Sequence, residues 1–195
     1  MRTAVFGVIL CWHFSSGVAV AAPLTELERQ RLIAHLELTG SWLADEVSDL
    51  SPAQLGFRPA PGAWTILEVL DHLLVVAPIY WQDLQRAVKA PVGRKTTMSD
   101  VDILWYGIDR TNRERAIPSE IPKGLKDLGA GLAEYRRLQA RLVEYVRTTT
   151  DDLRSRFVER QGCDAYQWAL LISTHEQRHV LQIREIKADP GFPAK

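Results

Sequence analysis

Hydrophobic residues recur every three or four positions in four long segments of this chain, which predicts four amphipathic helices. The segments run over about residues 25–50, 66–89, 125–150 and 165–189. No stretch of useful length alternates between hydrophobic and polar residues, so nothing in the pattern predicts a sheet. The expected fold is an all-α four-helix bundle, in which each hydrophobic stripe faces a common core.

Capping residues mark where three of these helices begin. Each has an N-cap residue followed three positions later by Glu or Gln: Thr25 and Glu28, Thr65 and Glu68, Asp164 and Gln167. Such pairs satisfy backbone N–H groups that have no partner within the helix. They predict helix starts near residues 26, 66 and 165.

A long connector joins the second and third predicted helices. Residues 90–124 contain three prolines and three glycines, and only residues 99–108 have a short helical pattern. A connection of this length inside a compact domain is usually functional or mobile. A shorter connector, residues 57–62, is expected to be extended because two prolines and a glycine interrupt it.

The N-terminus resembles a secretory signal. Met1-Arg2 precedes an uncharged, mostly apolar run, and Ala19-Val20-Ala21 fits an A-x-A cleavage site. We expect residues 1–21 to be a signal peptide, residues 22–195 to be one domain, and the protein to be exported to the periplasm or secreted. An uncleaved membrane anchor is the alternative, but the strongest apolar block, residues 4–12, is short for a spanning helix.

Charge and cysteine content narrow the function classes. The chain has 24 basic and 24 acidic residues, which argues against a nucleic acid or an anionic membrane as partner. After cleavage, Cys163 is the single cysteine, so the exported chain has no internal disulfide. Its stability must come from the core or from a bound metal.

Three histidines fall on the inward faces of two predicted helices. His175 and His179 are four residues apart, so their rings project from one face of the last helix, and His72 lies in the apolar stripe of the second. Each histidine alone is compatible with a hydrogen-bonded core residue, but together they are typical of a metal site in a helix bundle. Three imidazoles with an open position suit Zn²⁺, Ni²⁺ or Fe²⁺ and could activate a bound water or thiol. His35 is compatible with the core or the rim and is not assigned to this site.

His175-Glu176-x-x-His179 also matches the H-E-x-x-H pattern of metalloproteases. Those enzymes need a third ligand, usually well downstream, but only sixteen residues follow His179, and Glu185 lies on another side of the helix. They also bind an extended peptide along a strand, and none is predicted here. The surroundings of the pattern therefore argue against a protease. Glu176 lies off the inward stripe of the last helix, so we expect it at the surface or rim.

Several motifs in order resemble the DinB-like (DinB/YfiT) superfamily. They are Pro59-x-Pro61-Gly62-x-Trp64-Thr65-Ile66-x-Glu68-Val69-Leu70-x-His72-Leu73, Tyr166-Gln167-Trp168, His175-x-x-Arg178-His179-x-x-Gln182-Ile183 and Pro190-Gly191-Phe192-Pro193. The resemblance implies a four-helix bundle and a divalent metal bound by a histidine triad, which falls on His72, His175 and His179.

The resemblance also implies roles for neighbouring residues and for the metal. Gln182 would support a ligand or pack between helices, Arg178 would contact an anionic substrate or form a surface ion pair, and Asp71 would orient a ligand or cap the bundle mouth. Relatives of this kind are thought to be metal-dependent enzymes, some of which use low-molecular-weight thiols. Such thiols are cytosolic. The expected export of this chain therefore weakens the interpretation as a thiol transferase and favours metal-assisted hydrolysis or metal binding without catalysis.

The expected function is that of a metal-dependent hydrolase or transferase acting on a small molecule. The alternatives are a bundle that binds metal without catalysis and an interaction module that uses the long connector. A second copy of the chain could cover an apolar patch at Trp105 and Tyr106, giving a homodimer.

Overall fold

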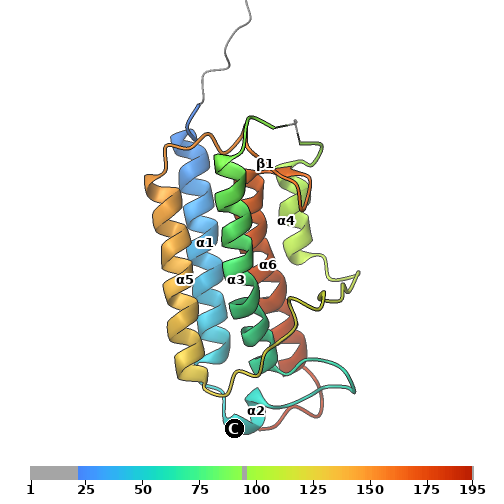
Figure 1. Cartoon of the computed structure of the whole chain (residues 1–195). Helices are drawn as coiled ribbons and strands as arrows, with labels where there is room; N and C mark the ends of the chain where they lie inside the picture. Colours follow the sequence, from blue (N-terminus) through green and yellow to red (C-terminus); the bar gives the residue numbers. More distant parts are fainter. Residues whose placement is uncertain (1–21, 94–95, 195) are drawn as a thin grey trace, which may run out of the picture.

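The computed structural model describes residues 22–93 and 96–194. The expected signal peptide, residues 1–21, lies outside the described residues. The elements are α1 (Glu26–Val47), α2 (Pro52–Leu55), α3 (Ile66–Lys89), α4 (Asp100–Ile108), α5 (Leu128–Thr148), β1 (Phe157–Val158), β2 (Cys163–Asp164) and α6 (Ala165–Lys187). The prediction of an all-α, four-helix bundle is confirmed by the long helices α1, α3, α5 and α6 (Figure 1).

The predicted capping residues begin their helices. Thr65 accepts from the backbone N–H of Glu68, whose carboxylate in turn accepts from the N–H of Thr65, and the other two predicted pairs form the same box. The third long helix begins three residues later than its hydrophobic stripe suggested, because Asp127 serves as N-cap by accepting from the N–H of Ala130. The caps therefore locate helix starts better than periodicity does.

The order of the helices around the bundle explains the long connector. α1 packs against α5 and α6, and α3 packs against the same two helices from the other side. In Figure 1, α1 and α6 run downward while α3 and α5 run upward. Because α3 and α5 are parallel, the chain between them must return along the whole length of the bundle.

The short helix in this connector, α4, lies outside the bundle against α6 (Figure 1). The approach is close at Gly107, where an added Cβ would lie 2.9 Å from Cβ of Thr174 and 2.7 Å from Oε1 of Gln177. Trp105 points away and is 60% exposed, whereas Tyr106 is half-buried beneath the Arg178 guanidinium. Of the two residues expected in an exposed patch, only Trp105 is at the surface.

A two-stranded hairpin precedes α6. β1 and β2 are antiparallel, with Phe157 opposite Asp164 and Val158 opposite Cys163, and β1 packs against α3. This hairpin was not predicted, because strands of two residues are too short to show a period.

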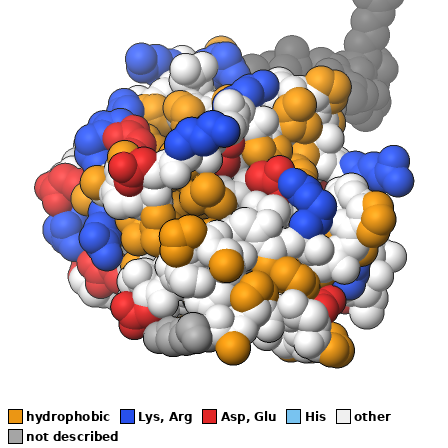
Figure 2. All heavy atoms as spheres, turned by 90° about the horizontal axis from the view of Figure 1, so that it is seen from below, with side chains coloured by type: hydrophobic (Ala, Val, Ile, Leu, Met, Phe, Trp, Pro, Cys, Tyr) orange, Lys and Arg blue, Asp and Glu red, His pale blue; other side chains and the backbone are white. Residues whose placement is uncertain are grey.

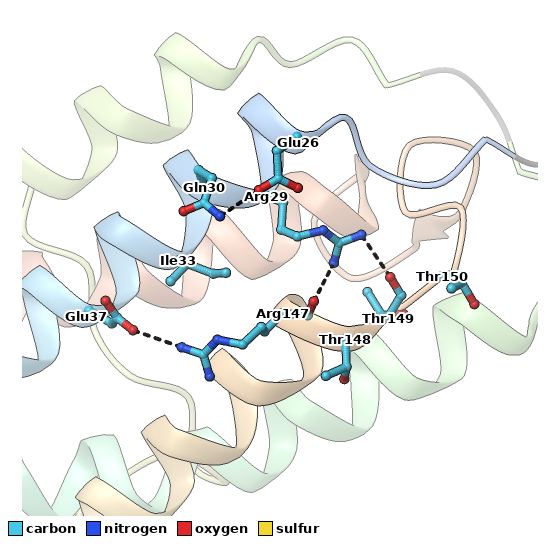
Figure 3. Close-up of a pocket in the computed structure, with 9 residues that line it drawn as sticks. All are labelled: Glu26, Arg29, Gln30, Ile33, Glu37, Arg147, Thr148, Thr149 and Thr150. Carbon is cyan, nitrogen blue, oxygen red and sulfur yellow. Dashed lines mark hydrogen bonds and ion pairs between the residues drawn. The ribbon is translucent and has the colours of Figure 1, made fainter.

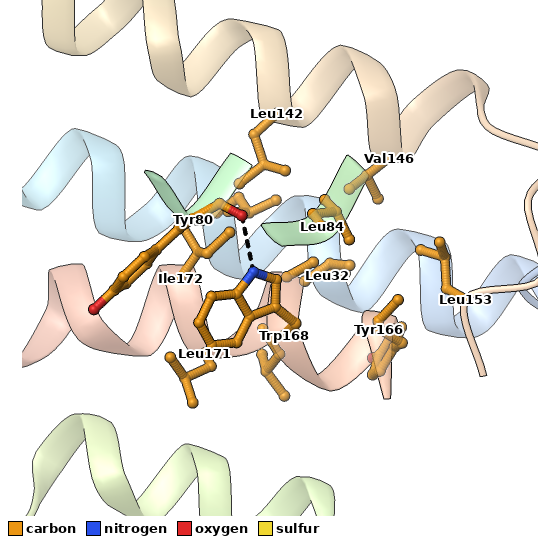
Figure 4. Packing of buried hydrophobic residues seen from close by; sticks show 14 of the residues in the cluster. Leu32, Tyr80, Leu84, Leu142, Val146, Leu153, Tyr166, Trp168, Leu171 and Ile172 are labelled. Carbon is orange, nitrogen blue, oxygen red and sulfur yellow. Dashed lines mark hydrogen bonds between the residues drawn. The ribbon is translucent and has the colours of Figure 1, made fainter. Parts of the chain in front are cut away.

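Two hydrophobic clusters fill the bundle. The upper cluster is centred on Trp168, which is fully buried and donates from Nε1 to the carbonyl of Tyr80 at 2.9 Å (Figure 4). The lower cluster lies between the first turns of α3 and the last turns of α6 and includes Leu70 and Ile183. His175 and His179 lie between the two clusters along α6, whereas His72 lies within the lower cluster along α3, between Leu70 and Leu73.

The surface carries charges of both signs. Figure 2 shows acidic and basic side chains together with hydrophobic ones on the lower face, and neither sign forms a continuous field there. Within the described residues, none of the helices has the length and apolar character needed to cross a membrane.

Candidate metal centre

The structure brings His72, His175 and His179 together. Nε2 of His175 lies 3.3 Å from Nε2 of His72 and 3.2 Å from Nε2 of His179. The three possible ligand atoms lie within 4.8 Å of one another. α3 supplies one imidazole and α6 supplies two from successive turns of one face, as the spacing predicted. This cluster could hold a metal ion.

The hydrogen bonds on the far side of two rings fix which nitrogen faces the centre. His72 donates from Nδ1 to the backbone carbonyl of Glu120 at 2.6 Å, because a carbonyl oxygen can only accept. Nδ1 of His179 lies 2.8 Å from Oε1 of Gln182, which accepts its hydrogen. Both rings therefore present the lone pair of Nε2 to the centre, the arrangement that metal-binding histidines adopt.

The spacing of the three nitrogens fits a small divalent ion. Tetrahedral Zn²⁺ with Zn–N bonds of about 2.0–2.1 Å separates two ligand nitrogens by roughly 3.3–3.4 Å. The two Nε2 separations of 3.3 and 3.2 Å are close to that value. Among the described residues, the cluster contains no fourth His, Cys, Asp or Glu, so positions on an ion would remain for other ligands.

Burial keeps the three imidazoles neutral. Their exposed fractions are 3% for His72, 7% for His175 and 9% for His179. Desolvation is the main cause that lowers the pKa of all three, and together with the neighbouring His72 it lowers the pKa of His175 to about 3. Neutral imidazoles are the form that binds metal, so the folded protein offers ready ligands at neutral pH.

Aromatic rings enclose the triad. The Trp64 ring lies 4.8 Å from that of His72 and 6.3 Å from that of His179, while the Tyr80 ring lies 5.5 Å from that of His175. These rings surround the imidazoles with apolar surface. Any ion held here would therefore sit in an environment of low polarity, where electrostatic effects are strong.

Glu176 contradicts the expectation of a surface or rim residue, because it is only 7% exposed. Its carboxyl group accepts from the Tyr135 hydroxyl at 3.0 Å and from Nε2 of Gln139 at 3.1 Å. Desolvation raises its pKa to about 8. The expectation failed because α6 is covered by α1, α3 and α4, so that side chains off the histidine face are buried as well. Since the Glu176 carboxyl group is hydrogen-bonded to two side chains of α5, we do not assign it as the base that the H-E-x-x-H pattern would require.

Arg178 was expected to make a surface ion pair or touch substrate, but it is 7% exposed and holds the connector. Its guanidinium donates to the backbone carbonyls of Tyr106, at 3.1 Å, Asp109 and Asn112. The sequence could not show this role, because backbone carbonyls have no residue signature.

Asp71 fastens the other end of the connector. Its Oδ2 accepts from the backbone N–H groups of Lys123 and Gly124, both at 2.6 Å, and Leu125 at 3.0 Å. Gly124 has a φ of +98°, a conformation that favours glycine. Asp71 was expected to orient a ligand or cap the bundle mouth, and the structure shows that it ties residues 123–125 of the connector to α3. Gln182 supports His179, one of the two roles expected of it.

The sequence did not predict two residues near the triad. They are Glu120, whose carbonyl contacts His72, and Arg160, which pairs with the Glu120 carboxylate. His35 stands apart, with Nδ1 2.7 Å from the Ser173 hydroxyl.

A hollow away from the triad lies between α1 and the end of α5 (Figure 3) and has a volume of about 540 Å³. Arg29 in its wall donates to the carbonyls of Val146, Arg147 and Thr149, and Arg147 pairs with Glu37. These arginines cap the end of α5 and tie it to α1. None of the triad lines this hollow.

Comparison with known proteins gives the family. A solved structure, that of YfiT from Bacillus subtilis, described as "a probable metal-dependent hydrolase with an unusual four-helix bundle topology", superposes with a TM-score of 0.56 at 20% identity and covers 87% of this chain and 91% of its own. The protein YuaE of Bacillus subtilis (strain 168) is 28% identical over 150 residues, which are 73% of this chain and 89% of YuaE. The model of the DinB superfamily matches residues 26–183. A match over this much of the bundle shows that the chain belongs to the DinB superfamily.

Proposed function

We propose that this protein is a metal-dependent enzyme, a hydrolase or transferase acting on a small molecule, with its metal bound by Nε2 of His72, His175 and His179. The observation that carries the proposal is the convergence of three neutral imidazole nitrogens at 3.2 and 3.3 Å with the lone pairs of two fixed toward the centre. YfiT, which shares the fold, is described as a probable metal-dependent hydrolase.

A divalent ion held by three neutral imidazoles supplies a Lewis acid that lowers the pKa of a bound water or thiol. The residues of the chain have supporting roles. Glu120 and Gln182 hold the ligand rings, and Trp64 and Tyr80 limit the access of bulk water. The carboxyl groups of Glu120 and Glu176 are engaged by Arg160 and Tyr135, so we assign neither of them as general base.

The test is elemental analysis of the chain beginning at Ala22, with His72→Ala, His175→Ala and, as matched control, His35→Ala. His35 is hydrogen-bonded to Ser173 and lies outside the triad. We expect about one metal ion per chain in the wild type and in His35→Ala, and loss of metal in the other two with the helical spectrum retained. Metal that survives His72→Ala, or its absence from the wild type after supplementation with zinc, nickel and iron, would contradict the proposal.

A metal with a purely structural role is the second candidate, favoured by the low exposure of the three imidazoles. An enzyme should keep an exchangeable water on the ion, whereas a structural site should unfold when it is stripped. Turnover of ester, amide and phosphoester substrates, each with and without an added thiol, distinguishes a hydrolase from a thiol transferase. A metal-loaded wild type without exchangeable water would favour the structural role.

A further inference from the structure

Arg160 links the β1–β2 hairpin to the connector that crosses the triad. It lies in the turn between the two strands, and its guanidinium forms an ion pair with the carboxylate of Glu120. Glu120 is 7% exposed, and the Arg160 side chain is 30% exposed. An ion pair with one partner this deeply buried is costly to break, because the remaining charge would be left without compensation.

The position of Arg160 is fixed on its other sides as well. Its guanidinium lies 3.9 Å from Oδ2 of Asp83 and 5.2 Å from the centroid of the Tyr80 ring. That oxygen of Asp83 is buried and has no hydrogen-bond partner, while the other oxygen pairs with Arg86. Asp83 and Tyr80 both come from α3, the helix that carries His72. The guanidinium therefore sits between the helix of one metal ligand and the connector.

Glu120 occupies the part of the connector that the two end clamps do not reach. Arg178 holds the carbonyls of residues 106, 109 and 112, and Asp71 holds the N–H groups of residues 123–125. Between them, Glu120 donates its N–H to the carbonyl of Ile117 at 2.9 Å, a local turn that does not fix it to the bundle. Arg160 supplies a side-chain contact from outside the connector at this point.

The same residue makes the contact to the ligand ring. The Glu120 carbonyl accepts from Nδ1 of His72, and this bond decides that Nε2 carries the lone pair facing His175. If the carbonyl moves away, the ring can move its hydrogen to Nε2, and that tautomer cannot bind a metal at the centre.

We propose that Arg160 is a positioning residue for His72, which it holds in the metal-binding tautomer by fixing Glu120. The proposal rests on the proposed function only in its last step, the binding of metal. The tautomer of His72 is a property of the chain itself. It can be measured before any metal is added.

The test compares Arg160→Met with Arg86→Met. Both arginines pair with Asp83, but only Arg160 reaches Glu120, so Arg86→Met controls for the loss of a cation beside α3. Two-bond ¹⁵N–¹H correlation spectra of the metal-free protein report which nitrogen of His72 bears hydrogen. The signal is assigned by its loss in His72→Gln. We expect the Nδ1–H tautomer in the wild type and Arg86→Met, and a substantial fraction of Nε2–H in Arg160→Met.

Metal affinity, measured by competition with a chelator, is the second readout. Loss of the partner behind a metal ligand typically weakens binding about 10–100-fold, which is the drop expected for Arg160→Met. Should Arg160→Met fail to fold, Glu120→Ala carries the same test, because it removes the carboxylate but keeps the carbonyl. An unchanged tautomer, or an affinity within about twofold of that of Arg86→Met, overturns the proposal. A wild type that binds no metal overturns the proposed function instead, and the tautomer alone then decides the role of Arg160.

Discussion

At the scale of single residues, burial separates neighbours in the sequence into different roles. His175 and Glu176 are adjacent and both are 7% exposed, yet His175 belongs to the triad and Glu176 accepts a hydrogen bond from Tyr135 of α5. Desolvation moves their pKa values in opposite directions, since it favours the neutral form of each: down for the imidazole and up for the carboxyl. Both side chains are therefore largely uncharged at neutral pH.

This gives a pH-dependent prediction for Glu176→Gln. The pKa of Glu176 is about 8 in the folded protein against an ordinary value of 4.5, so the folded form retains a proton that the unfolded chain releases. The stability from this group is complete below pH 4.5 and is lost as the pH rises through 8. Glutamine cannot ionise, so the variant should lose less stability than the wild type between pH 4.5 and 8, by roughly 4 kcal/mol.

Urea denaturation at pH 4.5, 6 and 8 measures the difference. Glu114→Gln, at an exposed position of the connector, is the control and should follow the wild type within experimental error. Equal slopes for wild type and Glu176→Gln would show that the carboxyl group is ionised in the folded protein.

At the scale of elements, the sequence predicted the helices well and their surroundings poorly. Periodicity and caps are local, so α3 and α6 could be placed to within about two residues and their histidines to one face. The role of Glu120 depends on a backbone carbonyl brought from 48 residues away, and any residue type supplies one. Glu176 was misplaced for a related reason: a stripe identifies one buried face but not a helix covered on several sides.

The attachment of the connector to the bundle can be tested directly. Asp71→Asn keeps the shape of the side chain but removes the carboxylate, whose Oδ2 accepts hydrogen bonds from three backbone N–H groups. All three bonds end on one oxygen, and an amide oxygen in the same place accepts less strongly than a carboxylate oxygen, so the three hydrogen bonds would weaken. We expect a loss of about 1–3 kcal/mol in the free energy of unfolding.

Hydrogen exchange locates the effect of Asp71→Asn. The amides of Lys123, Gly124 and Leu125 should exchange faster while those of α5 stay protected. Asp45→Asn, on the exposed face of α1, serves as the control. Uniform acceleration along the whole chain would indicate global destabilisation and contradict a local clamp.

At the scale of the whole molecule, the triad lies close to the boundary between the two hydrophobic clusters and draws ligands from two helices. A bound ion would cross-link α3 to α6 near this boundary. Binding to the folded state alone stabilises by about 2.7 kcal/mol at a free metal concentration about 100 times the Kd. That corresponds to a rise in Tm of roughly 5–10 °C for a chain of this size.

Thermal unfolding of the wild type with metal and after chelation tests this expectation. His35→Ala should show the same shift as the wild type, and His72→Ala should show none. A shift of equal size in His72→Ala would place the stabilising ion elsewhere on the protein.

The separation of the ligands along the chain has a consequence for how the protein is made. His72 precedes His175 by 103 residues, and the two meet only when α6 packs against α3. While the ribosome is still synthesising α5, the nascent chain has one of the three imidazoles and no site. A metal held by the triad would therefore enter only after the last helix has been released from the ribosome and has packed against α3.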